Sequence, residues 1–234
     1  MKRKPRIKRP AKPAQNTRPL QGATPKVFPR RRLFLAITGA SGAPYALRAL
    51  ELLAPRTDLE LHVCVSRGAC EVLRHETGLA LPASPTPADL RRALRLPDSV
   101  TLHALDAIAA GPSSGSFAIE AMLVLPCSMG TMAAIAHGLA DNLIVRAASV
   151  MLKERRKLIL VPRETPLSLI QIENMLKVTQ AGAIVLPAMP GFYGRPTSVA
   201  DLVDFVVARA LETAGFSPGR IGVHWKGPSR NATS

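Results

Sequence analysis

The 234-residue sequence has no apolar run of 18 residues, few aromatic residues and only three cysteines. We therefore expect no membrane-spanning helix. Cys64, Cys70 and Cys127 form no CxxC pair, and the five histidines lie at no spacing typical of zinc ligands. This cysteine usage predicts reduced thiols in a cytoplasmic protein, and the spacing of cysteines and histidines predicts no metal site.

Acidic residues are absent from residues 1–32, which hold twelve Lys and Arg. This segment carries most of the net charge of +15 and leaves +3 for the rest of the chain. Because it is rich in Pro, Lys and Arg and lacks apolar periodicity, we predict a disordered basic tail. The tail is consistent with nucleic-acid contact, an anionic surface, a mitochondrial transit peptide or a solvated extension without a partner. Because residues 33–234 carry a net charge of only +3, we do not expect the protein to bind nucleic acid as its main function.

Short apolar runs alternate with helical patterns along residues 33–216. The runs at 33–38, 59–65, 122–126, 158–161 and 183–186 are typical of buried strands. Repeated strand–helix units predict an α/β fold: a three-layer αβα domain with a parallel Rossmann- or flavodoxin-like sheet. We expect a last helix from Ser198 to about Ala214, with Val199 on its apolar face. Residues 217–234 are predicted to form a C-terminal extension.

A glycine-rich turn, Gly39-Ala40-Ser41-Gly42, follows the first predicted strand and opens a helix. Glycines let backbone N–H groups approach a phosphate, and the N-terminus of a helix favours negative charge. A tight turn without any ligand is the alternative, because this turn alone is not GxGxxG. The turn indicates a nucleotide or flavin phosphate as a leading ligand.

Polar residues also follow the strands at 122–126 and 158–161. Ser128, Thr131, Arg163 and Glu164 stand there, at the sheet edge where open α/β folds bind ligands. Glu164 beside Arg163 indicates either proton transfer or a carboxylate that holds the arginine, with a surface ion pair as the alternative. Cys127 is more typical of a packed small residue than of a nucleophile.

Two cations and a serine loop complete the candidate residues. Arg146 and Lys153 lie two helical turns apart on one face, which indicates an anionic ligand or a solvated basic helix. The hydroxyls of the loop 113–116 either bind an anion or cap a following helix, and the cap is the simpler interpretation.

The order of these motifs is more specific than any one of them. Along the chain the motifs follow in this order: GASG (39–42), Ser66, SSGSF (113–117), PCSxxT (126–131), LKERR (152–156), PRETPL (162–167), GFYxxP (191–196) and Arg209. In this order, over residues 33–215, they resemble the UbiX-type flavin prenyltransferases. The sequence departs from that pattern at Gly130, where many members carry Lys, and at Gly191, where Ala is common.

The resemblance implies an enzyme that takes reduced FMN and dimethylallyl phosphate. It implies transfer of the dimethylallyl group to flavin N5 and C6, without a metal, to make prenylated FMN. That product serves UbiD-type decarboxylases, in ubiquinone biosynthesis or aromatic acid decarboxylation. The resemblance also implies a homododecamer with sites between subunits.

The resemblance assigns roles to individual residues. Glu164 would act as acid and base, Ser41 would assist it, and Glu76 would be a further contact. The flavin would meet Gly39, Ala40, Ser41, Gly42, Ser66, Ser128, Met129, Gly130, Thr131 and Arg163. The allyl phosphate would meet Arg146, Lys153, Tyr193 and Arg209, of which Arg146 and Lys153 would also act in catalysis.

Two other functions stay open at this point. An FMN-dependent decarboxylase of the cysteine type shares the fold, but it needs a His near the first helix and a PASANT-like loop, and the sequence has neither. A nucleic-acid-binding protein would use the basic tail, and its binding would fall steeply with salt.

Overall fold

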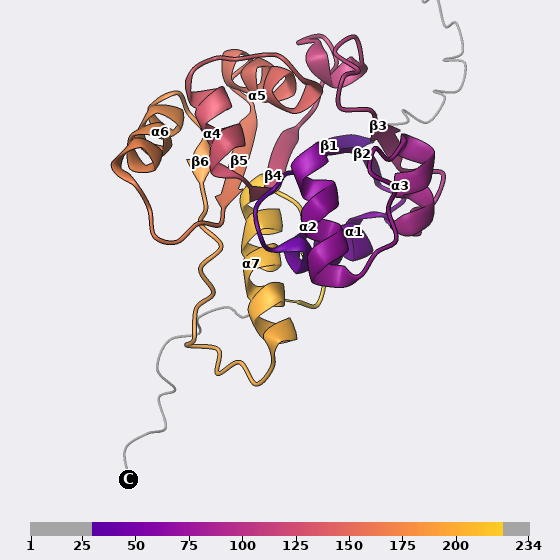
Figure 1. Ribbon diagram of the computed structural model, residues 1–234, viewed down its shortest axis with the longest axis vertical. Helices are drawn as coiled ribbons and strands as arrows, with labels where there is room; N and C mark the ends of the chain where they lie inside the picture. The colour runs from indigo at the N-terminus through magenta and orange to yellow at the C-terminus, as the bar shows by residue number, and fades with distance from the viewer. Residues whose placement is uncertain (1–29, 222–234) are drawn as a thin grey trace, which may run out of the picture.

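A six-stranded, all-parallel sheet forms the middle of the computed structural model, which describes residues 30–221 (Figure 1). The strands lie in the order β3-β2-β1-β4-β5-β6. Their bounds are β1 Arg31–Ile37, β2 Leu59–Val65, β3 Thr101–His103, β4 Ala121–Cys127, β5 Lys157–Pro162 and β6 Ile184–Val185. The predicted parallel sheet is confirmed, although β6 is shorter than the run 183–186.

Helices cover both faces of the sheet. They are α1 Ala43–Leu53, α2 Arg67–Thr77, α3 Pro87–Ala93, α4 Met129–Ala136, α5 Leu143–Lys153, α6 Leu169–Gln180 and α7 Val199–Ala214, with a 3₁₀ helix, η1, at Gly111–Ser113. One core joins the sheet to α1, α2, α3 and α7, and a second joins its other face to α4, α5 and α6. The predicted three-layer αβα architecture is confirmed. No described helix is long and apolar enough to cross a membrane.

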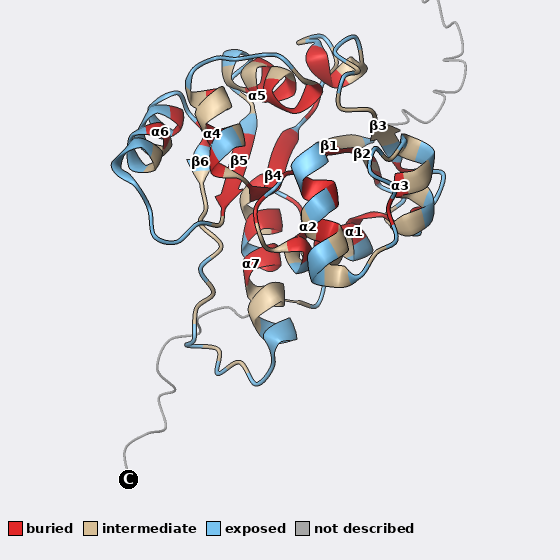
Figure 2. Cartoon of the chain, viewed as in Figure 1, coloured by how far each residue is buried: buried red, intermediate tan, exposed pale blue. Residues whose placement is uncertain are grey.

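The central strands are buried on both faces, which explains their continuous apolar sequences. In β1, Leu33 and Leu35 enter the α1–α7 core, whereas Phe34 and Ala36 enter the α4–α5 core, as the two-residue period of a strand requires. Every residue of β4 is buried (Figure 2). Burying each such large side chain contributes about 1.5–3 kcal/mol, so these strands carry much of the stability.

Three sequence expectations change at the edges of this fold. The strand β1 begins at Arg31, so the sheet starts two residues earlier than the predicted tail boundary. Val199 is 75% exposed, because the first turn of α7 projects beyond the sheet (Figure 1). The expected helix cap at 113–116 is wrong, because Ser113 ends η1 and the next element is the strand β4. The predictions for 1–29 and 222–234 lie outside the described residues.

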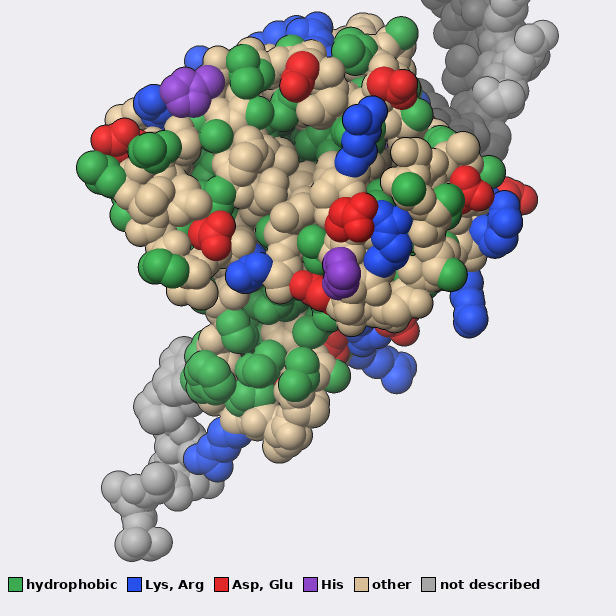
Figure 3. Space-filling model, in the orientation of Figure 1, with side chains coloured by type: hydrophobic (Ala, Val, Ile, Leu, Met, Phe, Trp, Pro, Cys, Tyr) green, Lys and Arg blue, Asp and Glu red, His purple; other side chains and the backbone are tan. Residues whose placement is uncertain are grey.

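Charges of both signs are interspersed over the face of the molecule in Figure 3. Many of them pair across elements, such as Arg48 of α1 with Asp204 of α7 at 2.7 Å. This face shows no broad surface of one sign for a polyanion.

A pair of histidines connects β2 to β3. His62 Nδ1 lies 3.0 Å from His103 Nε2, and the two rings stack with centroids 5.2 Å apart. Glu60 lies 3.0 Å from the other nitrogen of His62 and also accepts from Arg32. Burial lowers the pKa of His62, and burial together with the neighbouring His62 lowers the pKa of His103 to about 4. The geometry therefore favours two neutral rings, one donating to the other.

This pair predicts a loss of stability in mild acid. Between pH 6.5 and about 4 the unfolded chain protonates His103 while the folded chain keeps it neutral. Acidification therefore favours unfolding, by up to about 3 kcal/mol from this one group. We expect His103→Gln to flatten the loss of unfolding free energy over this range in denaturant titrations, whereas the exposed-site control His137→Gln keeps it. An unchanged pH dependence in His103→Gln would refute the assignment.

Candidate functional site

The turn 39–42 connects β1 to α1 at the carboxyl edge of the sheet. A Cβ on Gly39 would lie 3.0 Å from the backbone of Gly68 in the first turn of α2, so glycine favours this close approach of the turn to the helix. Gly42 has φ +123°, which a side chain rarely adopts. Pro44 stands in the first turn of α1, as predicted. The turn therefore has the tight geometry that the sequence predicts.

Glu76, at the end of α2, reaches across to the N-terminus of α1. Its Oε2 accepts the N–H groups of Gly42 at 2.9 Å and Ala43 at 2.8 Å. Burial opposes ionisation of Glu76, but hydrogen bonds from Ser41, Gly42 and Ala43 outweigh it and lower the pKa of the carboxyl. A carboxylate of the chain itself thus occupies the anion position at α1.

The junction of β4 and α4, residues 126–131, offers a second helix N-terminus, that of α4. Ser128 caps this helix: its Oγ accepts the Thr131 N–H at 3.2 Å and donates to Thr131 Oγ1 at 3.0 Å. In the described part of the chain, the N–H groups of Met129 and Gly130 have no hydrogen-bond acceptor. A Cβ on Gly130 would meet nothing within 4 Å. Two hydroxyls and two unpaired N–H groups suit the phosphate of FMN.

Arg163 and Glu164 follow β5 but do not pair with each other. Arg163 is half-buried, and its Nε donates to the carbonyl of Ser41 at 3.1 Å, so it connects the β5 end to the turn after β1. Glu164 is exposed and accepts the N–H of Thr165 at 3.1 Å. The Glu164 carboxylate therefore does not hold Arg163 in place. The carboxylate is left available for proton transfer.

Cys127 and Ser66 take structural positions at the same edge. Cys127 is fully buried, and burial raises the pKa of its thiol to about 12, so it is a packed residue and not a nucleophile. Ser66 caps α2 by accepting the Ala69 N–H at 3.2 Å, and its own N–H donates to Ile37.

The four predicted phosphate ligands lie in two groups on opposite faces of the sheet. Arg146 and Lys153 belong to α5, and Lys153 pairs with Glu154 at 2.5 Å. Arg209 belongs to α7 and donates to Glu212 at 2.9 Å, while Tyr193 lies in the loop after β6. Because α5 and α7 pack in different cores, the sheet separates the two groups within one chain.

The loop that carries Tyr193 packs against α7. Tyr193 meets Phe205 edge-on with ring centroids 5.6 Å apart. A Cβ on Gly191 would lie 2.8 Å from the Tyr193 ring and 2.9 Å from the Phe205 ring. The glycine that replaces the common Ala thus lets both rings close onto the backbone, and an Ala here would require them to move.

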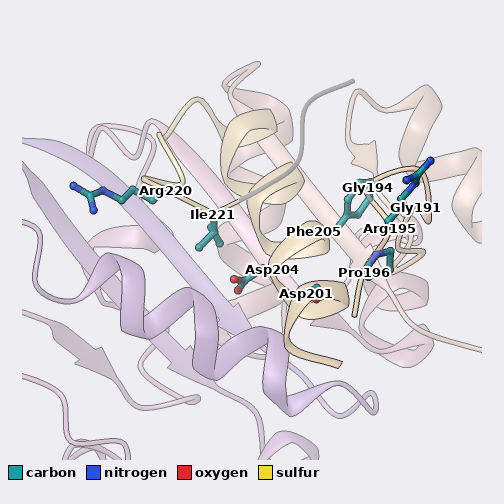
Figure 4. A pocket seen from close by; sticks show the side chains of 9 residues that line it. All are labelled: Gly191, Gly194, Arg195, Pro196, Asp201, Asp204, Phe205, Arg220 and Ile221. Atoms are coloured by element: carbon teal, nitrogen blue, oxygen red, sulfur yellow. The ribbon is translucent and has the colours of Figure 1, made fainter. Parts of the chain in front are cut away.

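A cavity of about 330 Å³ lies beside this loop (Figure 4). Asp201 and Asp204 line it, but Asp201 accepts the N–H groups of Thr197 and Ser198, and Asp204 pairs with Arg48. Figure 4 shows the guanidinium of Arg220 pointing away from the other lining residues. The carboxylates here are already paired, so the cavity adds little to the site at the sheet edge.

Comparison with known proteins agrees with this geometry. The family model described as Flavoprotein matches residues 23–211. The flavin prenyltransferase UbiX of Pseudomonas aeruginosa is 49% identical over 187 residues, which cover 79% of this chain and 89% of that protein. The chain belongs to the flavin prenyltransferases.

Two solved structures of this type share the fold closely. The UbiX protein AnUbiX (PadA1), solved in complex with FMN and dimethylallyl pyrophosphate, is 41% identical, with a TM-score of 0.74 over 86% of this chain and 100% of that one. A dodecameric FMN-dependent UbiX-like decarboxylase from Escherichia coli O157:H7 is also 41% identical, with a TM-score of 0.74 over 84% of this chain and 100% of that one. A flavin prenyltransferase fold is thus present over the described residues.

The structure brings together one part of the predicted site and leaves the other divided. The ten residues predicted to contact the flavin lie together at the carboxyl ends of β1, β2, β4 and β5. They are Gly39, Ala40, Ser41, Gly42, Ser66, Ser128, Met129, Gly130, Thr131 and Arg163. Spacing and periodicity did not indicate the separation of Arg146 and Lys153 from Tyr193 and Arg209, since only the packing shows which face each helix covers. The separation is consistent with the sites between subunits that the resemblance implies.

Proposed function

We propose that this protein transfers a dimethylallyl group from dimethylallyl phosphate to N5 and C6 of reduced FMN. The observation that carries the proposal is the cluster of Ser41, Ser128, Thr131 and Arg163 at the sheet edge, in a chain of this family. The fold places these side chains at the point where the strand order reverses, between β1 and β4. Open α/β sheets bind their ligands at such a point.

Different residues of the site bind the two phosphorylated substrates, FMN and dimethylallyl phosphate. The N-terminus of α4, with Ser128 and Thr131, holds the flavin phosphate, and Arg163 keeps the turn after β1 in place. Reduced FMN supplies the electron-rich atoms that accept the allyl group. When the allyl–phosphate bond breaks, negative charge grows on the phosphate, and cations stabilise it.

Glu164 completes the reaction as a proton carrier. Closure of the new ring adds a proton to C2 of the N5-linked allyl group, breaks the double bond so that C3 joins C6, and removes the proton from C6. An exposed carboxylate next to the sheet edge is suited to carry this proton. The same group, once protonated, can donate to the departing phosphate. Ser41, hydrogen-bonded to Glu76, assists in handling the proton.

A second copy of the chain is required to complete the phosphate site. Arg146 and Lys153 of one subunit would meet Tyr193 and Arg209 of another, in a trimer-based homododecamer. The apolar surface supports this assembly: Leu169, Ile170, Met189 and Phe192 are each 69–71% exposed. Exposed apolar surface of this extent is typical of subunit contacts. The protein acts in the cytoplasm, and a UbiD-type decarboxylase uses the prenylated FMN that it makes.

A mass measurement tests the reaction directly. The full chain is incubated without oxygen with reduced FMN and either dimethylallyl phosphate or the diphosphate. We expect a flavin heavier by one C5H8 unit with the monophosphate. Unchanged FMN with both donors would contradict the proposal, and product from the diphosphate alone would correct its donor.

A further inference from the structure

Thr38 is a buried residue between the end of β1 and the turn 39–42. It is only 1% exposed. Its Oγ1 donates to the carbonyl of Pro126 at 2.8 Å and accepts the N–H of Ser128 at 2.7 Å. A hydroxyl has one proton and two lone pairs, so it makes both bonds at once. One side chain thus connects the turn after β1 to the junction of β4 and α4.

The sheet needs this connection because its regular pairing ends just before the site. The strands β1 and β4 pair in register up to Ala36 and Val124. The pairing of β4 with β5 then shifts register between Val124 and Cys127. Beyond that point the backbone joins the end of β1 to the end of β4 through the N–H of Thr38, which donates to the carbonyl of Pro126 at 3.2 Å. The N–H of Ser128 depends on the hydroxyl.

We propose that Thr38 is a positioning residue that sets the spacing of the two flavin-contacting loops. This inference rests on the proposed function, in which those loops bind FMN. Thr38 acts through Ser128, which orients Thr131, and through the turn 39–42, whose Ala40 N–H donates to the Thr38 carbonyl at 2.9 Å. A bridge of this kind fixes both loops before the flavin arrives.

Thr38→Val removes the hydroxyl and keeps the shape of the side chain. The N–H of Ser128 then has no partner in a partly buried position, and the loop must move to reach water. Thr38→Ser keeps the hydroxyl and removes only the methyl group. The two variants therefore separate the hydrogen bonds from the packing.

The test measures oxidised FMN binding by fluorescence quenching, together with the thermal midpoint of each variant. We expect Thr38→Val to raise the Kd for FMN about tenfold and to shift the visible flavin spectrum of the complex. Thr38→Ser should bind within about twofold of the wild type. Leu53→Val, a core change at the far end of α1, is the control for lost stability alone, and it should leave the Kd unchanged.

Three outcomes would overturn the inference: wild-type FMN binding by folded Thr38→Val, equal losses in the Ser and Val variants, or an equal loss in Leu53→Val. If Thr38→Val does not fold, Thr38→Ala replaces it, and equal binding by the Ala and Ser variants would refute the role of the hydroxyl. FMN binding needs no prenyl transfer. A wild type that makes no prenylated flavin would contradict the proposed reaction and leave this test intact.

Discussion

Glu164→Gln should bind FMN like the wild type and form prenylated FMN roughly 10²–10⁴-fold more slowly. Gln has the same shape, and its carbonyl oxygen still accepts the N–H of Thr165, which Glu164 accepts at 3.1 Å. The geometry of the loop is therefore kept, and the ability to take up and release a proton is lost. Single-turnover experiments without oxygen, with product measured by mass, check the rate.

A matched control distinguishes this role from a general effect of charge. Glu173→Gln removes another exposed carboxylate, on α6, and should react at the wild-type rate. A Glu164→Gln variant that turns over at nearly the wild-type rate would remove Glu164 from the chemistry. A variant that fails to bind FMN would instead place Glu164 among the flavin contacts.

Arg209→Ala should weaken capture of the allyl phosphate about 10- to 100-fold and leave the Kd for FMN within twofold. Arg209 lies on α7, away from the flavin residues, and the charge that it offers a phosphate is lost in the variant. The measurement is the KM for dimethylallyl phosphate beside the Kd for FMN.

The control for Arg209→Ala is another exposed arginine without a proposed role. Arg92, on α3, has a side chain that is 81% exposed, and Arg92→Ala should change neither constant. Equal losses of flavin and allyl phosphate binding in Arg209→Ala would indicate damage to α7 and contradict a specific phosphate contact.

Local signals in the sequence located the elements well. Pro44 and Ser198 mark the starts of α1 and α7, where the structure places them. The apolar run around Val124 identifies β4, because a strand buried on both faces leaves no polar positions. The ten residues assigned to the flavin also meet, since carboxyl ends of parallel strands share one edge.

Long-range effects could not be read from the sequence. Glu76 reaches the N-terminus of α1 from the end of another helix, and no spacing rule predicts that contact. Val199 fits the apolar periodicity of α7 but lies on a turn that projects past the sheet. Periodicity shows which face of a helix is apolar, but it does not show how far the partner surface extends.

The division of the proposed phosphate ligands has the largest consequence for the proposed function. Arg146 and Lys153 lie on the α5 side of the sheet, and Tyr193 and Arg209 belong to the loop and helix of the other side. A sheet with fully buried central strands separates them, so under the proposed function one chain alone would hold two half-sites for phosphate.

Mixing of subunits tests this account most directly. Lys153→Ala and Arg209→Ala are each expected to be nearly inactive at low allyl phosphate. They are dissociated, mixed in equal amounts and reassembled. If each site combines one half from each of two subunits, about a quarter of the sites in the mixture have both halves intact, and a corresponding share of activity returns. A mixture as inactive as its parents, with reassembly confirmed by size, would contradict a site shared between subunits.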